Sequence, residues 1–251
     1  DWPEEQERTP SFDDMDLDPM LEKATVVACA GQHSILLRGA PGTGKSMLAA
    51  RLSSLLPPMP ATNHIEAMQI HSSRSERLPP GLLSGRPPFR NPHHQSSHAA
   101  IIGCPDYPGE IALAHGGILF LDELPEFRRD TIEALREPLE NGEVSVARVR
   151  ERARWPCAFM LVAACNNCPC GWNGSSVKQC RCGEAARAAY ERKLSGPILD
   201  RIDMHIGFPD RAADVGRVFC PDNSESRGRR MRASVLQART FAEHRNCDLG
   251  F

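Results

Sequence analysis

Gly39-Ala40-Pro41-Gly42-Thr43-Gly44-Lys45-Ser46 is the stretch that decides the fold of this 251-residue chain. It matches the phosphate-binding pattern GxxxxGK[ST] at every specified position. An apolar run, Ser34–Arg38, precedes it and a helical pattern follows it, which is the strand–loop–helix setting that this loop requires. A glycine-rich turn that happens to contain a lysine is the alternative, and the flanks on both sides argue against it.

The composition of the loop suits a polyphosphate. Gly42 and Gly44 allow backbone N–H groups to turn inward where a Cβ would obstruct them. The helix that begins at Gly44 directs the positive end of its dipole at the same anion. In this motif Lys45 reaches the β- and γ-phosphates and the Ser46 hydroxyl binds Mg²⁺. The loop therefore predicts ATP and Mg²⁺ as ligands.

A second apolar strand, Gly117–Leu121, ends in two acids, Asp122 and Glu123. We expect Asp122 to hold the Mg²⁺, mostly through water, and Glu123 to orient and activate the attacking water. Two acids that cap a helix are the alternative. The expected nucleotide-binding residues are Gly39, Ala40, Pro41, Gly42, Thr43, Gly44, Lys45, Ser46, Met47 and Asp122, with Ser46 and Asp122 as the Mg²⁺ ligands.

Outward from the loop, apolar strands alternate with helices. The patterns predict strands at 34–38, 117–121, 144–146, 158–164 and 203–207. They predict a helix that is capped by residues 16–19 and runs to about residue 30, and further helices at 44–56, 131–139, 185–194 and 228–244. They also predict a long irregular segment at 79–109 with a short helix at 97–102. Strands that are apolar throughout indicate a parallel sheet covered on both faces, hence an α/β fold with three αβα layers. We expect a flexible lead-in at 1–15, a core domain at 16–208 and a partial helical lid at 209–251.

The composition of the chain argues against a polybasic, a membrane-spanning or a secreted disulfide-rich protein. The chain is 41% hydrophobic and 25% charged with a formal net charge of −2, values typical of a globular protein without a general polybasic signature. No apolar run approaches the ~18 residues of a membrane span, and the acidic start has no signal-peptide character. Ten cysteines beside a nucleotide site fit a reducing cytosol better than a disulfide framework, so we expect a cytoplasmic protein that does not contact membranes.

Four of the cysteines form a cluster. Cys168, Cys170, Cys180 and Cys182 lie within 15 residues, and four thiolates can close a tetrahedral Zn²⁺ site in a loop that has no core of its own. The C-x-C spacing is tighter than the usual C-x₂-C. Free buried thiols and disulfides are the alternatives. Because the loop follows Asn166 directly, a metal there would stiffen that strand end.

Two other groups of side chains are ambiguous. Arg148, Arg150, Arg152 and Arg154 alternate beside an expected hairpin, so that in a strand they would form one row suited to phosphates; an edge strand protected by charge is the alternative. Aromatic residues make up only 6% of the chain, so platforms for base stacking are sparse. For His93, His94 and His98 we favour ordinary hydrogen bonds over a metal site.

Together these segments resemble the AAA+ ATPases of the magnesium-chelatase class, and most closely the ComM (YifB) competence-protein family. The resemblance covers about 34–208. It depends on the phosphate-binding loop and on Arg90–His94, Pro108–His115, Gly117–Phe127, Leu161–Gly171 and Ser195–Asp203. It implies that Asn166 is the sensor-1 residue and that Arg201 is an arginine finger acting on a neighbouring subunit of a hexameric ring. A surface ion pair of Arg201 with Asp200 or Asp203 is the alternative.

The resemblance also implies a function. We expect Lys45, Glu123, Asn166 and Arg201 to be the catalytic residues of an ATP-driven ring motor that acts on DNA, as a helicase or branch-migration factor in natural transformation and recombination. A magnesium-chelatase-type motor that remodels a partner protein, or a weakly hydrolysing nucleotide-dependent scaffold, is the alternative. Relatives also carry a Lon-protease-like domain and a complete lid with a sensor-2 arginine, so this chain resembles a fragment with a shortened lid, and Arg239 suits the first lid helix better than sensor 2.

Overall fold

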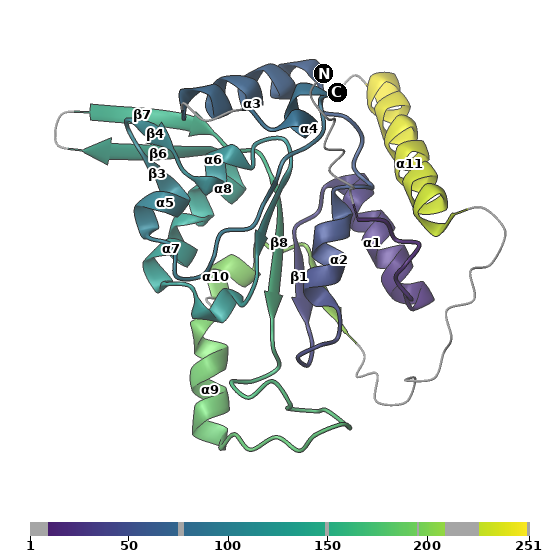
Figure 1. The fold of residues 1–251 in the computed structure, drawn as a ribbon, viewed down its shortest axis with the longest axis vertical. Helices are drawn as coiled ribbons and strands as arrows, with labels where there is room; N and C mark the ends of the chain where they lie inside the picture. Colours follow the sequence, from purple (N-terminus) through teal and green to yellow (C-terminus); the bar gives the residue numbers. More distant parts are fainter. Residues whose placement is uncertain (1–9, 75–77, 149–150, 195, 209–225, 250–251) are drawn as a thin grey trace, which may run out of the picture.

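A parallel sheet of five strands forms the centre of the molecule (Figure 1). The structure is a computed structural model that describes residues 10–74, 78–148, 151–194, 196–208 and 226–249. The strand order is β2-β5-β8-β1-β9, and every neighbouring pair is parallel. The strands are β1 (Ile35–Arg38), β2 (Phe89–Arg90), β5 (Ile118–Leu121), β8 (Met160–Cys165) and β9 (Met204–Gly207).

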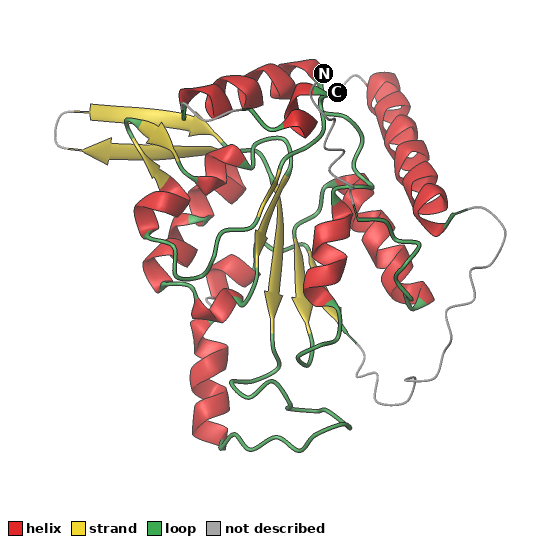
Figure 2. Cartoon of the chain, viewed as in Figure 1, coloured by secondary structure: helices red, strands yellow, loops and turns green. Residues whose placement is uncertain are grey.

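Helices cover both faces of the sheet (Figure 2). Alternate strand residues point to opposite faces, so Ile35 and Leu37 enter one apolar cluster and Leu36 enters the other. The first cluster is completed by α1 (Pro19–Gly31), α2 (Lys45–Leu52) and α11 (Arg227–Leu249), and the second by α5 (His98–Ile102), α7 (Arg129–Ala134) and α10 (Gly196–Leu199). The predicted three-layer α/β fold is therefore confirmed.

Two predicted helices end or break earlier than expected. The helix α2 ends at Leu52 rather than at Leu56, although Leu55 and Leu56 remain buried in the turn that follows. The helix expected at 131–139 consists of α7 and α8 (Arg136–Asn141), which meet at a turn. Pro138 has no N–H to donate to the carbonyl four residues earlier, which explains the break.

The segment before β5 is more regular than expected. It contains α3 (Ala61–Ser73), which no sequence pattern indicated, together with α4 (Pro80–Leu83), the edge strand β2 and a small antiparallel pair, β3 (Gly103–Cys104) with β4 (Tyr107–Pro108). The short helix α5 lies where predicted, capped by the Ser97 hydroxyl. Two-residue strands carry too little pattern to be detected from sequence, because their pairing is decided by tertiary contacts.

The expected flexible lead-in is wrong for residues 10–15. Phe12 is fully buried in the first apolar cluster, and Met15 belongs to the same cluster. The buried guanidinium of Arg51 donates hydrogen bonds to the carbonyl of Ser11 and to the carboxylate of Asp14, which lowers the pKa of Asp14. Residues 1–9 lie outside the described part of the chain.

The last helix, α11, packs against α1. Met231 and Val235 are buried in the same cluster as α1, and the Arg239 guanidinium donates to the carbonyl of Cys29 in α1. The chain between β9 and α11, residues 209–225, lies outside the described part. Among the described helices, none has the length and apolar character needed to cross a membrane.

A two-stranded hairpin extends from the body of the molecule, on the side of the sheet that carries the second apolar cluster (Figure 1). It consists of β6 (Glu143–Arg148) and β7 (Glu151–Pro156). Val144 and Val146 are buried in the second cluster, while Arg152 and Arg154 are exposed on the opposite face, across from Ala147 and Ser145. Arg150 and the side chain of Arg148 lie outside what the structure describes, so the described part of the expected row consists of two arginines.

Candidate functional site

The candidate site lies at the carboxyl ends of four strands of the sheet. Gly39 follows β1, Asp122 follows β5, Asn166 follows β8 and Phe208 follows β9. All four strands run in the same direction, so their carboxyl ends meet at this edge, which is where open α/β sheets bind ligands. Backbone hydrogen bonds hold these strand ends together: the N–H of Gly39 donates to the carbonyl of Cys165, and the N–H of Phe208 donates to the carbonyl of Arg38.

The phosphate-binding loop adopts a conformation that only glycine allows easily. Gly42 and Gly44 have φ values of 78° and 93°, in the left-handed region. A Cβ at Gly42 would meet nothing within 4 Å, whereas one at Gly39 would lie 2.7 Å from the Cβ of Phe208. Gly42 therefore borders open space and Gly39 is needed for close packing. The Thr43 hydroxyl donates to the carbonyl of Ala40 and stabilises the turn.

Lys45 is buried at the centre of the loop, 8% exposed. Its Nζ donates to the carbonyls of Gly39 and Ala40 at 2.9 and 2.8 Å, and lies 3.3 Å from Oδ1 of Asn166. Burial lowers the pKa of Lys45, and the nearby Asp122 carboxylate acts in the opposite direction. One cation thus connects the phosphate-binding loop to the end of β8.

Ser46 and Asp122 meet across the site. The Ser46 hydroxyl donates to Oδ2 of Asp122 at 2.7 Å, although the two residues are 76 positions apart in sequence. A hydroxyl and a carboxylate are the oxygen ligands that Mg²⁺ prefers, and the lysine ammonium beside them suits phosphate oxygens. With open space over Gly42, this set of donors fits a nucleotide with its Mg²⁺ ion.

Glu123 is held in an unusual backbone conformation. Its φ is 53°, one of two positive values among the described non-glycine residues, and its N–H donates to Oδ1 of Asp122. Non-glycine residues in this region are uncommon and cluster at functional sites. The half-exposed carboxylate lies 3.4 Å from Nδ1 of His94, whose ring packs edge-on against Phe127.

The contact between His94 and Glu123 was missed by the sequence analysis, which treated the loop histidines together. His98 does make an ordinary hydrogen bond, to the hydroxyl of Thr131. Nothing in the spacing of the chain links residue 94 to residue 123, because β2 and β5 are brought together by the sheet. The only available signal was the density of histidines in this segment.

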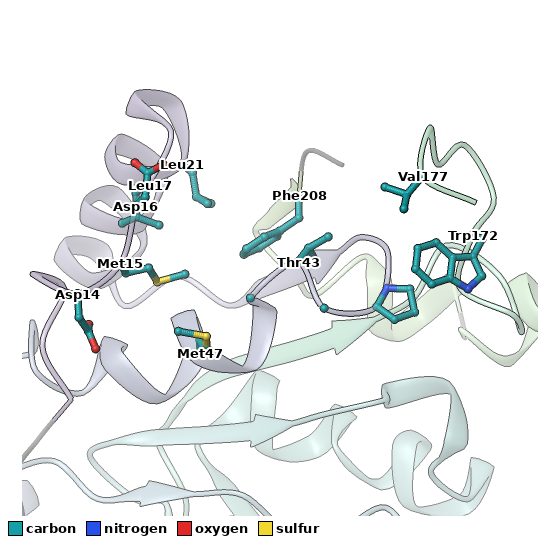
Figure 3. A pocket seen from close by; sticks show the side chains of 13 residues that line it. Asp14, Met15, Asp16, Leu17, Leu21, Thr43, Met47, Trp172, Val177 and Phe208 are labelled. Atoms are coloured by element: carbon teal, nitrogen blue, oxygen red, sulfur yellow. The ribbon is translucent and has the colours of Figure 1, made fainter. Parts of the chain in front are cut away.

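A pocket of about 350 Å³ opens beside the loop (Figure 3). Leu17 and Leu21 of the N-terminal region and Phe208 line one part, and Trp172 and Val177 lie across the phosphate-binding loop from them. Its volume lies in the range of small-molecule pockets, and apolar walls next to a phosphate-binding loop suit the base and sugar of a nucleotide. Of the residues that line the pocket, the sequence analysis identified Pro41, Gly42, Thr43, Gly44 and Met47.

Arg201 lies in the turn between α10 and β9, and no contact joins it to Lys45, Ser46 or Asp122 among the described residues. Its guanidinium makes an ion pair with Glu140 of α8 and donates to the carbonyl of Pro197. The alternative partners expected from sequence are therefore wrong: Asp203 instead accepts a hydrogen bond from the N–H of Ser34.

The four cysteines of the predicted metal site come together in the loop between β8 and α9 (Glu184–Lys193).

Comparisons with known proteins place the chain in a family context. Residues 12–215 match the family model described as magnesium chelatase, subunit ChlI. The chain is 45% identical over 237 residues to the uncharacterized protein Rv2897c of Mycobacterium tuberculosis, covering 91% of this chain and 45% of that protein. It is 44% identical over 185 residues to the uncharacterized protein YifB of Salmonella typhimurium, covering 73% and 36%.

A further relative carries a functional name. The chain is 44% identical over 190 residues to the competence protein ComM of Haemophilus influenzae, covering 75% of this chain and 37% of that protein. The chain thus spans between about a third and half of the length of the curated relatives that it matches.

Proposed function

The chain belongs to the family of magnesium chelatase, subunit ChlI, a family of the AAA+ type, and we propose that it is the ATP-hydrolysing module of a ring motor that acts on DNA. One observation carries the ATPase part of the proposal. Side chains that follow β1, β5 and β8 form one set beside a pocket of about 350 Å³: Ser46 donates to Asp122, which lies 76 residues away, and Lys45 donates to Asn166.

Each residue of the set has a role in this proposal. The backbone of the loop and the Lys45 ammonium bind the phosphates, while Ser46 and Asp122 hold Mg²⁺, which neutralises charge on the phosphate oxygens. Glu123 orients the attacking water and accepts its proton, and Asn166 helps to position that water. The contact of Asn166 with Lys45 supports its role, because it places the amide next to the phosphate-binding cation.

The ring and its finger depend on the family relationship. In a hexameric ring, Arg201 of one subunit would act on the γ-phosphate held by its neighbour. Its position outside the set around Lys45 of its own chain supports an action across subunits. In the single chain the guanidinium is paired with Glu140, an ion pair that docking on a neighbour would have to break.

The β6–β7 hairpin is the proposed contact with DNA. Arg152 and Arg154 are exposed, lie on one face of β7 and are backed by strand residues that pack on the core. Such a pair suits two phosphates of a nucleic-acid backbone. The name of the relative ComM, a competence protein, supports DNA as the substrate.

Removal of the two arginines tests the contact. We expect the double variant Arg152→Ala/Arg154→Ala to bind duplex DNA more weakly and to reduce the slope of log affinity against log salt by about 1.8, since two phosphate contacts are lost. The matched control is Arg230→Ala/Arg232→Ala, which removes the same charge from α11. Salt titrations of DNA binding by fluorescence anisotropy measure both. An equal loss in the two variants would assign the effect to net charge and contradict a contact at the hairpin.

The motor as a whole is tested by ATP turnover with and without branched DNA. We expect stimulation by DNA that is lost in Arg152→Ala/Arg154→Ala. Turnover that ignores DNA but responds to a chelatase partner protein would favour a magnesium-chelatase-type motor. Nucleotide-dependent assembly without turnover would favour a scaffold.

A further inference from the structure

The loop between β8 and α9 gathers four thiols. Cys168, Cys170, Cys180 and Cys182 each place their Sγ atom within 4.8 Å of the other three. Cys168 is buried and the other three are partly buried. The sequence separates the two pairs by nine residues, so the convergence is produced by the path of the loop.

The spacing of the sulfur atoms matches a metal site better than disulfides. Zn–S bonds of about 2.3 Å in a tetrahedron place the thiolates about 3.8 Å apart. The Sγ of Cys168 lies 3.4 Å from that of Cys170 and 3.7 Å from that of Cys180, and Cys170 lies 3.7 Å from Cys180. A disulfide requires about 2.0 Å. All four cysteines are free thiols in the structure.

The loop has little else to hold its shape. Residues 166–183 contain no helix or strand. Backbone N–H groups of Asn173 and Cys182 donate to the sulfur atoms of Cys168 and Cys180.

The same loop forms one wall of the nucleotide pocket (Figure 3). Trp172 and Val177 line the pocket, and both lie between the two cysteine pairs in sequence. Gly171 has no room for a side chain, since a Cβ there would lie 2.4 Å from the ring of Pro41 in the phosphate-binding loop. The Lys178 ammonium lies over the Trp172 ring, 5.4 Å from its centroid.

We propose that Cys168, Cys170, Cys180 and Cys182 hold one zinc ion, and that this ion fixes the loop that carries Trp172 and Val177 against the nucleotide. The evidence for the metal site is the arrangement of the four thiols and does not depend on the proposed function. Its effect on nucleotide binding rests on the proposed ATPase function.

The zinc content of the chain tests the site. We expect one zinc per chain by elemental analysis of protein purified under reducing conditions and dialysed after exposure to Zn²⁺. Co²⁺ in its place should give the sulfur-to-metal charge-transfer absorption of a tetrathiolate site. The variant Cys182→Ser should lose tight binding, while the control Cys104→Ala, which removes a buried thiol outside the cluster, should retain one zinc. Wild-type protein that retains no metal, or that forms disulfides within the cluster when Zn²⁺ is present, would overturn the site.

The effect of zinc on nucleotide binding is measured with the wild-type chain, because a cysteine variant that folds poorly would also lose nucleotide affinity. We expect removal of zinc by a chelator, with reductant present, to weaken the binding of MgADP at least about fivefold, because the aromatic wall is no longer fixed. Renewed addition of Zn²⁺ should restore the affinity. Equal affinities with and without zinc would overturn the coupling but not the site. A zinc-loaded chain that binds no nucleotide would contradict the coupling and the proposed function together.

Discussion

The variant Glu123→Gln is expected to bind MgATP as tightly as the wild type and to hydrolyse it about 10²–10⁴-fold more slowly. Glutamine preserves the size of the side chain and its hydrogen bonds but cannot accept the proton of the attacking water. Only the backbone N–H of Glu123 contacts Asp122, while its carboxylate pairs with His94, so binding of the phosphates and Mg²⁺ should not depend on the charge of Glu123. Affinity by calorimetry and turnover by phosphate release separate the two effects.

The matched control for Glu123→Gln is Glu126→Gln, three residues further along. Glu126 is a half-exposed acid that pairs with Lys193, away from the phosphate-binding loop. Its neutralisation should leave turnover nearly unchanged, since exposed ion pairs contribute little. Glu123→Gln with turnover within about threefold of the wild type would remove Glu123 from the role of base, because a lost general base has a larger effect.

The variant Arg201→Ala is expected to lose about 10³–10⁵ in turnover in assembled protein, the range measured for arginine fingers. The reason is electrostatic: the guanidinium would neutralise charge that develops on the γ-phosphate in the transition state. Its loss should leave the affinity of a single chain for nucleotide unchanged, since Arg201 makes its contacts with Glu140 and Pro197 rather than at the phosphate-binding loop.

Mixing experiments distinguish a finger that acts on a neighbour from a structural arginine. Lys45→Ala has an inactive site but an intact finger, and Arg201→Ala has the reverse. In a ring with head-to-tail interfaces, an equal mixture of the two should recover about a quarter of wild-type turnover, because one interface in four joins a sound site to a sound finger. Recovery absent from every mixing ratio would contradict action across subunits. Glu140→Gln, which frees Arg201 without removing it, should remain active.

The structure explains which parts of the fold the sequence could predict. The phosphate-binding loop, the strands around it and the acids at 122–123 are local patterns whose geometry is set by glycine, helix capping and apolar runs. The parallel sheet then brings strand ends together without further information, so the contact between Ser46 and Asp122 follows from two motifs 76 residues apart.

The features that the sequence did not reveal depend on tertiary contacts. Phe12 lies in a polar, acidic segment that has the composition of a frayed terminus, and its order comes from packing in the first apolar cluster and from the hydrogen bonds of Arg51 to Ser11 and Asp14 on either side of it. The pairing of His94 with Glu123 requires β2 beside β5, a pairing only two residues long. Trp172, which lines the pocket, is brought there by the loop that carries the four cysteines rather than by any strand or helix.

The most direct test of the ATPase site is a calorimetric titration of the 251-residue chain with the magnesium complex of a non-hydrolysable ATP analogue. We predict binding at one site that weakens about 10- to 150-fold in Lys45→Ala, the effect of a lost charge-assisted hydrogen bond to phosphate. Lys23→Ala, which removes an exposed lysine from α1, should bind like the wild type. A wild-type chain that does not bind the analogue, or that binds it equally with and without Lys45, would contradict the site on which the whole account depends.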